Sequence, residues 1–335
     1  MKPDALLREV KVEDAVGMVL AHDLTQIIPG EFKGRLFKKG HVIREEDIPA
    51  LLSIGKEHIY TLHLTEGWLH EDDAAGRIAA AAGGDHVEFG APHEGKITLK
   101  SAIRGLAKID KVRVDAVNAI DQVIVSTIKT DTVVQPGQAL VGTRVIPLVI
   151  EEETVAQAVR VLDEPLVQVK PFRPLKVGLI TTGSEVFKGR IADKFGPVVK
   201  EKVAVLGSEV IDQRFTPDDT DAIVAEIRRF LEQDRVDLLL LTGGMSVDPD
   251  DRTPGAIKRA GARIVSYGTP MLPGSMLLIG YMPRGVEEVP VMGLPGCVMH
   301  DPYTSFDVLL PRVCAGETVT REDITAMGYG GLLGC

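Results

Sequence analysis

The second half of the chain alternates short apolar runs with amphipathic segments. Residues 177–180 and 237–241 have the length of buried strands, whereas residues 220–231 place their apolar side chains on one helical face. Strands that alternate with helices predict a mostly parallel sheet covered on both faces, and a ligand crevice at the carboxyl ends of its strands. The other expected elements are helices at 197–206, 252–260 and 301–310 and strands at 210–215, 263–267, 276–281 and 289–292.

The first half has shorter elements and more turns. Residues 45–54 predict an amphipathic helix and 58–64 a strand, while the alanine run of residues 79–82 predicts a helix that stops at Gly83-Gly84. Residues 112–124 and 139–150 are rich in Val and Ile and are typical of strands. With Pro171 and Pro174 as a linker, we expect a doubly wound α/β domain at 174–335 after smaller, β-rich N-terminal domains at 1–66 and 67–170.

The net charge and the cysteine content argue against several classes of protein. The 335 residues contain 38 Lys and Arg against 48 Asp and Glu, a net charge of −10, which argues against a nucleic-acid binder or an anionic-membrane binder. No apolar stretch approaches the ~20 residues of a membrane span, and no secretory signal is visible, so we expect a cytoplasmic protein. The odd set Cys297, Cys314 and Cys335, without CxxC spacing, argues against a disulfide scaffold or a structural zinc site.

The predicted strand at 237–241 is followed by the segment Thr242-Gly243-Gly244-Met245-Ser246, which contains two glycines. Glycines let the backbone approach a ligand closely, and their N–H groups together with the Ser246 hydroxyl could donate to phosphate oxygens. An ordinary strand-to-loop turn explains most Gly-Gly pairs taken alone. The GxxxxGK[ST] pattern of a Walker loop is absent.

Acidic residues gather after the same strand and after the preceding one. Asp248, Asp250 and Asp251 could hold Mg²⁺ beside a phosphate, or could form a solvated loop ahead of a helix that Thr253 caps. Asp218 stands at a helix start, where capping alone would explain it.

Cys297 follows the tight turn Gly293-Leu294-Pro295-Gly296. It lies near the N-terminus of the helix expected at 301–310, and a helix N-terminus would lower the pKa of the thiol. His300 is the close candidate base for such a nucleophile, but nothing supplies a third, orienting group.

Taken together, these segments resemble the molybdopterin-binding domain of molybdenum-cofactor biosynthesis proteins, the MogA-like type, over about residues 174–313. Each segment is common by itself, but the ordered set is specific. The N-terminal part, through residues 15–23 and 36–62, resembles more distantly the molybdenum-insertion branch, the MoeA and gephyrin E-domain type. The matching segments of the domain are Thr182-Gly183-Ser184-Glu185, Gly189 with Asp193, residues 216–219, residues 243–246 with Asp251 and Thr253, Pro273-Gly274, and Leu294-Pro295-Gly296.

The resemblance implies a domain that binds the phosphate and dithiolene tail of molybdopterin. It implies that Asp218 and Asp251 are the paired catalytic or magnesium-handling acids, and that Glu185 and Asp193 are further pocket acids. The remaining cofactor-binding residues that it implies are Thr182, Gly183, Ser184, Thr242, Gly243, Gly244, Ser246, Pro273, Gly274, Leu294, Pro295 and Gly296.

The chain also departs from the insertion branch. Residues 28–32 replace its acidic PxFDNSAMDGYA-like segment, its kPGkP lysines are missing around Pro273-Gly274, and its LPGNP becomes LPGCV at residues 294–298. Lost lysines weaken the stabilisation of phosphoryl charge.

Three functions therefore compete. The first is an enzyme that transfers a nucleotide or molybdenum on molybdopterin, or on its adenylylated form, with Mg²⁺. The second is a non-catalytic carrier or regulatory binding module, and the third a hydrolase of a nucleotide-like pyrophosphate. A homodimer and molybdoenzymes are the protein partners that we expect.

Overall fold

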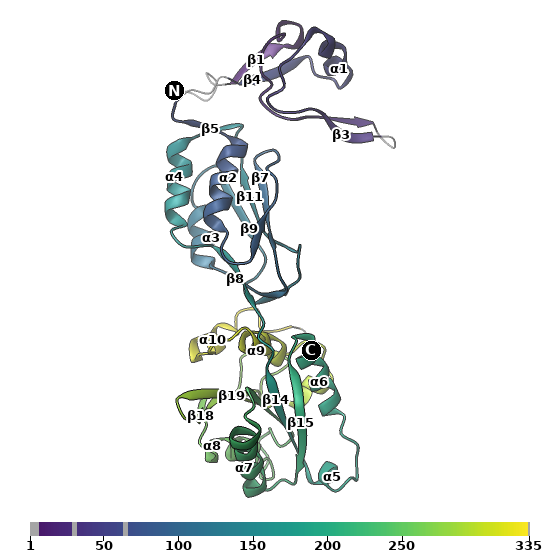
Figure 1. Ribbon diagram of the computed structural model, residues 1–335, viewed down its shortest axis with the longest axis vertical. Helices are drawn as coiled ribbons and strands as arrows, with labels where there is room; N and C mark the ends of the chain where they lie inside the picture. The colour runs from purple at the N-terminus through teal and green to yellow at the C-terminus, as the bar shows by residue number, and fades with distance from the viewer. Residues whose placement is uncertain (1–6, 29–31, 63–65, 334–335) are drawn as a thin grey trace. The chain divides into compact units, whose positions relative to one another are not determined.

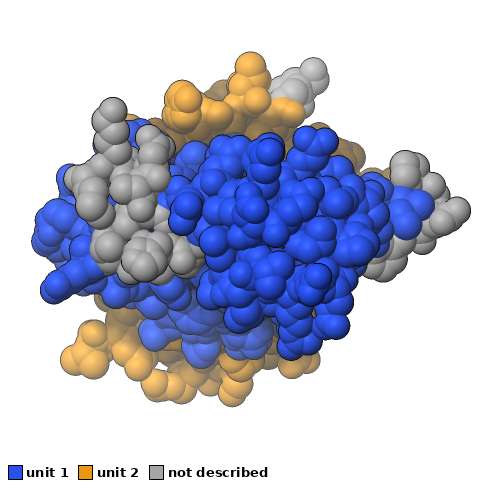
Figure 2. Space-filling view, turned by 90° about the horizontal axis from the view of Figure 1, so that it is seen from above, with its two compact units in different colours: residues 1–170 blue, residues 171–335 orange. Residues whose placement is uncertain are grey.

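A computed structural model describes residues 7–28, 32–62 and 66–333 (Figure 1). The replaced segment at 28–32 and Cys335 thus fall partly or wholly outside the described residues. The chain forms two compact units, residues 1–170 and 171–335, which Figure 2 colours separately. No helix among the described residues is long and apolar enough to cross a membrane.

Unit 1 begins with two antiparallel strand pairs and one short helix. Strand β1 (Leu7–Lys11) pairs with β4 (His58–Leu62), and β2 (Leu24–Ile28) pairs with β3 (Phe32–Phe37). Helix α1 (Ile48–Ser53) buries Leu51 against Val12, Leu20 and Ile59. This small core belongs to residues 10–59 alone.

The rest of unit 1 has a second and larger core beneath three helices (Figure 1). Helix α2 (Glu71–Ala82) lays its alanines on the four-stranded sheet β6-β7-β11-β9, and ends at Gly83 as predicted. The other elements are β5 (Trp68–His70), β6 (Val87–Phe89), β7 (Lys96–Ser101), β8 (Gly105–Ile109), α3 (Lys111–Asn118), β9 (Val123–Thr127), β10 (Thr132–Val134), β11 (Ala139–Val145), β12 (Val149–Glu151), α4 (Glu152–Val161) and β13 (Val167–Pro171).

The strand predicted over 112–124 is wrong in its first part, which is helix α3. Asp110 caps that helix, because its carboxylate accepts a hydrogen bond from the Arg113 backbone N–H at 3.1 Å. The β-branched residues that suggested a strand are not all buried, and the Val112 side chain is 77% exposed. The local cap outweighs β propensity there.

Unit 2 is the predicted doubly wound α/β domain. Its six-stranded sheet has the order β15-β14-β16-β19-β18-β17. The first four strands are parallel, whereas β18 and β17 add antiparallel, so the sheet is mixed at one edge. Its elements are β14 (Lys176–Thr182), α5 (Ser184–Phe187), α6 (Phe195–Val205), β15 (Glu209–Thr216), α7 (Thr220–Arg229), β16 (Leu238–Thr242), α8 (Thr253–Arg259), β17 (Arg263–Tyr267), β18 (Leu278–Arg284), β19 (Glu287–Leu294), α9 (Ser305–Cys314) and α10 (Arg321–Ala326).

The central strands are buried on both faces, as a parallel sheet between helices requires. Every residue of β16 is buried, and Leu239 and Leu241 pack with Ile223 and Ile227 of α7 and Ile257 of α8. Helix α6 contacts β14 and β15 as well. The alternation of apolar runs and amphipathic segments therefore predicted this architecture.

Helix α9 begins later than expected, at Ser305 instead of residue 301. Thr304 is the N-cap, since its hydroxyl accepts from the Phe306 backbone N–H while the Asp307 carboxylate accepts from the Thr304 backbone N–H. This reciprocal capping box fixes the helix start. Residues 296–299 form a separate 3₁₀ turn.

Candidate functional site

Four loops of unit 2 share one rim because the strands that precede them are parallel. Strands β14, β15, β16 and β19 all end at this edge of the sheet, and a ligand crevice is expected there in an open α/β sheet. The loops begin at residues 183, 217, 243 and 295.

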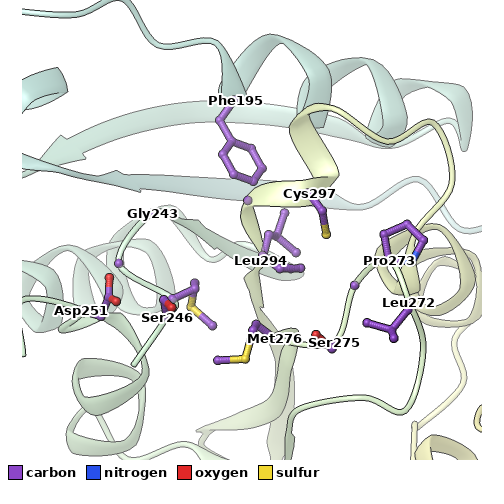
Figure 3. Close-up of a pocket in the computed structure, with 15 residues that line it drawn as sticks. Phe195, Gly243, Ser246, Asp251, Leu272, Pro273, Ser275, Met276, Leu294 and Cys297 are labelled. Carbon is purple, nitrogen blue, oxygen red and sulfur yellow. The ribbon is translucent and has the colours of Figure 1, made fainter. Parts of the chain in front are cut away.

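A cavity of about 520 Å³ opens among the loops after β16 and β19 and the segment at residues 272–276 (Figure 3). Its lining mixes glycine backbone, two serine hydroxyls, one carboxylate, one thiol and apolar side chains. The residues are Phe195, Gly243, Gly244, Met245, Ser246, Asp251, Leu272, Pro273, Gly274, Ser275, Met276, Leu294, Pro295, Gly296 and Cys297.

The glycine pair is required where the chain turns into this cavity. Gly243 has φ +84°, and a Cβ there would collide with the Thr182 carbonyl oxygen. Thr253 holds the turn, because its hydroxyl donates to the Gly243 carbonyl at 2.8 Å and its backbone N–H donates to the Gly244 carbonyl at 3.2 Å. Thr253 is the first residue of α8 and not its N-cap, which corrects the prediction.

Tyr267, the last residue of the antiparallel edge strand β17, holds the same loop through hydrogen bonds. Its hydroxyl donates to the carbonyl oxygens of Met245 at 2.8 Å and Ser246 at 3.1 Å. Burial, and then the negative charge of Asp251, raise the pKa of Tyr267 above its usual value, so the hydroxyl keeps its proton. No pattern in the sequence links Tyr267 to this loop.

A second hollow of about 550 Å³ shares Phe195 and Gly243 with the first. Thr182, Asp193 and Thr242 line it, together with apolar side chains that the sequence did not mark, such as Ile191 and Met299. Asp193 is already engaged there, since its carboxylate accepts from the Phe195 backbone N–H at 2.9 Å and from Gln213 Nε2 at 2.6 Å.

Asp218 and Asp219, which follow β15, have different hydrogen-bond partners. Asp219 is the N-cap of α7, accepting from the Ala222 backbone N–H at 2.8 Å. Asp218 instead accepts from the Ser184 backbone N–H at 2.8 Å, so it joins the loops after β14 and β15. Capping of α7 therefore does not account for Asp218.

The predicted site residues fall into three groups. Gly243, Gly244, Ser246, Asp251, Pro273, Gly274, Leu294, Pro295 and Gly296 line the first cavity. Thr182, Asp193 and Thr242 line the second. Gly183, Ser184, Glu185 and Asp218 follow strands of the same rim but line neither cavity.

Cys297 differs from the expectation of an activated thiol. Burial, and then the nearby Asp301, raise the pKa of its thiol. The lowered pKa had rested on the N-terminus of the helix predicted at 301–310, whereas that helix, α9, starts later, at Ser305.

The fold and the cavity together define the class of protein to which unit 2 is similar. Unit 2 is a doubly wound α/β domain whose candidate ligand site is built from glycine loops at the carboxyl ends of parallel strands. Residues 178–314 match the family model described as "Probable molybdopterin binding domain". The match lies in the part of the chain whose ordered motifs carry the resemblance, and it confirms that resemblance.

Individual curated proteins are similar to part of the chain. The molybdopterin molybdenumtransferase of Synechococcus elongatus is 30% identical over 158 residues, which is 45% of this chain and 38% of that protein. A CinA-like protein of Mycobacterium sp. (strain JLS) is 34% identical over 84 residues, 25% of this chain and 20% of that protein. The chain thus spans well under half the length of these curated relatives.

Among solved structures, the molybdopterin biosynthesis enzyme MoaB of Thermus thermophilus is 23% identical. The comparison covers 43% of this chain and 98% of that one, with a TM-score of 0.36. Residues 9–63 match a separate model described as "Domain of unknown function (DUF8806)". The likeness of the N-terminal segment to the molybdenum-insertion branch stays a prediction.

Proposed function

We propose that unit 2 binds molybdopterin or its adenylylated form, and that the chain acts in molybdenum cofactor biosynthesis. One observation carries the proposal: segments far apart in the sequence, chosen by their resemblance to this domain, line one cavity at the rim of the sheet. The family match over 178–314 supports it.

Hydrogen-bond donors in the first cavity suit a phosphate. Backbone N–H groups near Gly243 and Gly244 and the hydroxyls of Ser246 and Ser275 would donate to phosphate oxygens. The adjoining hollow, with Ile191, Phe195 and Met299, offers an apolar lining that suits the pterin ring system.

Transfer of a nucleotide or of molybdenum would need positive charge beside that phosphate. Asp251 is the carboxylate on the wall of the first cavity, and it already accepts from the Asp248 backbone N–H at 3.1 Å. Its remaining oxygen makes Asp251 the residue that would hold Mg²⁺. Asp218, the second acid that the resemblance implies, lines neither cavity and accepts from the Ser184 backbone N–H instead. A bound Mg²⁺ would supply charge that neutralises phosphate oxygens.

A non-catalytic carrier is the second candidate, and the composition of the lining favours it. The residues that line the first cavity include no Lys, Arg or His. A cavity lined without cationic side chains can hold a phosphate through backbone donors, but it stabilises a transferring phosphoryl group poorly unless Lys194, on the wall of the adjoining hollow, reaches that group.

An anaerobic experiment distinguishes the transferase from the non-catalytic carrier. The full chain is incubated with adenylylated molybdopterin, molybdate and Mg²⁺, and both bound pterin and released AMP are measured. Stoichiometric AMP and molybdenum cofactor support the transferase, whereas binding without product supports the carrier. Absence of binding, beside a working positive control, contradicts both.

Partners are a further part of the proposal. We propose that the chain forms a homodimer and delivers its ligand to molybdoenzymes. Light scattering after size exclusion would test the first statement, and a monomeric mass at micromolar concentration would contradict it.

A further inference from the structure

Residues 327–333, which we call the strap, run beside one wall of the first cavity. They follow α10 and lie beyond residues 178–314, the part of the chain that matches the family model. The wall is the segment at 272–276, where Leu272 and Pro273 lie across the cavity from Asp251 in Figure 3. Neither the ordered motifs nor the function proposed for unit 2 assigns the strap a role.

Leu272 is bound to the strap through both of its backbone groups. Its N–H donates to the Gly331 carbonyl at 2.8 Å, and its carbonyl accepts from the Leu333 N–H at 3.0 Å. Leu332, between these two residues, forms a parallel bridge with Leu272. The strap therefore holds the end of the wall at which Leu272 lines the cavity.

The other end of the wall is held from within residues 178–314. The hydroxyls of Thr269 and Ser305 both donate to the Gly274 carbonyl, at 2.8 Å and 2.7 Å. The Thr269 backbone N–H donates to the Ser275 carbonyl at 2.9 Å. A movement of the strap would therefore shift Leu272 and leave Gly274 in place.

Helix α10 anchors the strap and also contacts the strand behind the glycine loop. Arg312 of α9 donates to the Asp323 carboxylate of α10 at 2.9 Å. Arg321 of α10 contacts the Ser266 hydroxyl, and the next residue, Tyr267, holds the glycine loop. The segment that follows the family match thus contacts elements behind two walls of the cavity.

The strap is held by backbone fit and not by buried apolar side chains. Tyr329 is fully exposed and Leu332 is 75% exposed. A Cβ at Gly331 would lie 2.4 Å from the Pro270 carbonyl oxygen and 2.5 Å from the Met327 carbonyl oxygen. A surface contact with little apolar burial has low local stability, so the strap can respond to a change at the cavity.

We propose that the strap positions Leu272 and thereby sets the shape of the first cavity, so that ligand affinity depends on residues outside 178–314. Ligand and strap act on the same wall, and such coupling is reciprocal. The inference rests on the proposed function only for the identity of the ligand, molybdopterin.

Two glycines of the strap provide a matched pair of variants. Gly331→Ala places its Cβ against the Pro270 carbonyl, so the strap cannot keep its path, whereas the Cβ of Gly328→Ala meets nothing closer than 3.5 Å. We expect Gly331→Ala to bind molybdopterin at least about fivefold more weakly than the wild type, and Gly328→Ala to bind it equally. Anaerobic titration of the full chain measures both.

Cys297 reports on the cavity without any ligand. Its thiol lines the first cavity, whereas Cys314 is buried in α9. We expect iodoacetamide to label Cys297 about fivefold faster in Gly331→Ala than in Gly328→Ala, because the released wall opens the cavity. Cys314 should stay unlabelled in both variants, and peptide mass spectrometry measures the two sites separately.

Leu333 offers a second pair, which serves if Gly331→Ala fails to fold. Leu333→Pro removes the N–H that donates to the Leu272 carbonyl, whereas Leu333→Ala keeps it. We expect faster labelling of Cys297 in the proline variant alone.

Equal labelling of Cys297 within either folded pair would overturn the proposal. Faster labelling that extends to Cys314 would overturn it too, because it would show a general loss of stability and not a moved wall. Failure of the wild type to bind molybdopterin would contradict the proposed function, while the labelling of Cys297 would still decide the role of the strap.

Discussion

Two cysteines of unit 2 lie in surroundings that suppress their reactivity. Cys297 is half-buried on the cavity wall and its thiol pKa is raised. Cys314 is buried in α9, and burial raises its thiol pKa to about 11. Because the thiolate is the nucleophile, a raised pKa moves reactivity to higher pH.

We predict that iodoacetamide labels Cys297 with a pH midpoint above that of the same cysteine in the unfolded chain, and that native Cys314 stays unlabelled at pH 9. Peptide mass spectrometry with and without urea measures both. Faster labelling of Cys297 in the native protein at pH 7 would show an activated thiol and contradict the account.

Thr253 is the residue whose hydroxyl holds the glycine loop. It is fully buried, and besides donating to Gly243 it lies 3.2 Å from the Thr182 hydroxyl. We predict that Thr253→Val costs about 1–3 kcal/mol in the free energy of unfolding, because the carbonyl of Gly243 loses its donor. Urea unfolding measures the loss. Thr253→Ser, which keeps the hydroxyl, should lose less, and equal losses would show that packing alone matters.

At the scale of elements, the two aspartates that precede helix α7 have different structural roles. Asp219 caps the helix and Asp218 does not. We predict that Asp219→Ala lowers the free energy of unfolding by about 1 kcal/mol without changing ligand binding. Chemical denaturation and a binding titration measure the two effects. A loss of binding equal to that of Asp218→Ala would contradict this division of tasks.

The elements also show what the sequence could predict. The periodic segment at 220–231 and the apolar run at 237–241 fold as predicted because amphipathicity and burial act locally. Helix α3 was missed because the Asp110 cap overrides a Val-rich composition. The late start of α9 follows from a capping box that the predicted boundary ignored.

At the scale of the molecule, unit 2 has a hydrophobic core formed by its own residues. The cluster around Ile180, Phe230, Leu239 and Leu241 draws only on residues 180–291. We predict that residues 171–335 expressed alone unfold cooperatively, with a midpoint close to that of the same unit in the full chain. The only tryptophan, Trp68, lies outside residues 171–335, so its fluorescence cannot report on this unit. Circular dichroism measures the unfolding instead. A non-cooperative transition would contradict the division into two units.

The candidate site was predictable only where motifs lie next to strands that the pattern had located. Loops after β14, β15, β16 and β19 were found in this way. Tyr267 was not, because it holds the loop through hydrogen bonds to residues distant in the sequence, Met245 and Ser246.

Ligand binding to the cavity of unit 2 is the central claim, and two neighbouring positions test it. Ser246 lines the cavity, whereas Val247 beside it does not and is 82% exposed. Anaerobic titration of molybdopterin should show binding to the wild type and to Val247→Trp. It should show none, or binding at least about tenfold weaker, to Ser246→Trp, whose indole fills the cavity. Equal affinity of the two tryptophan variants would place the ligand elsewhere and contradict the account.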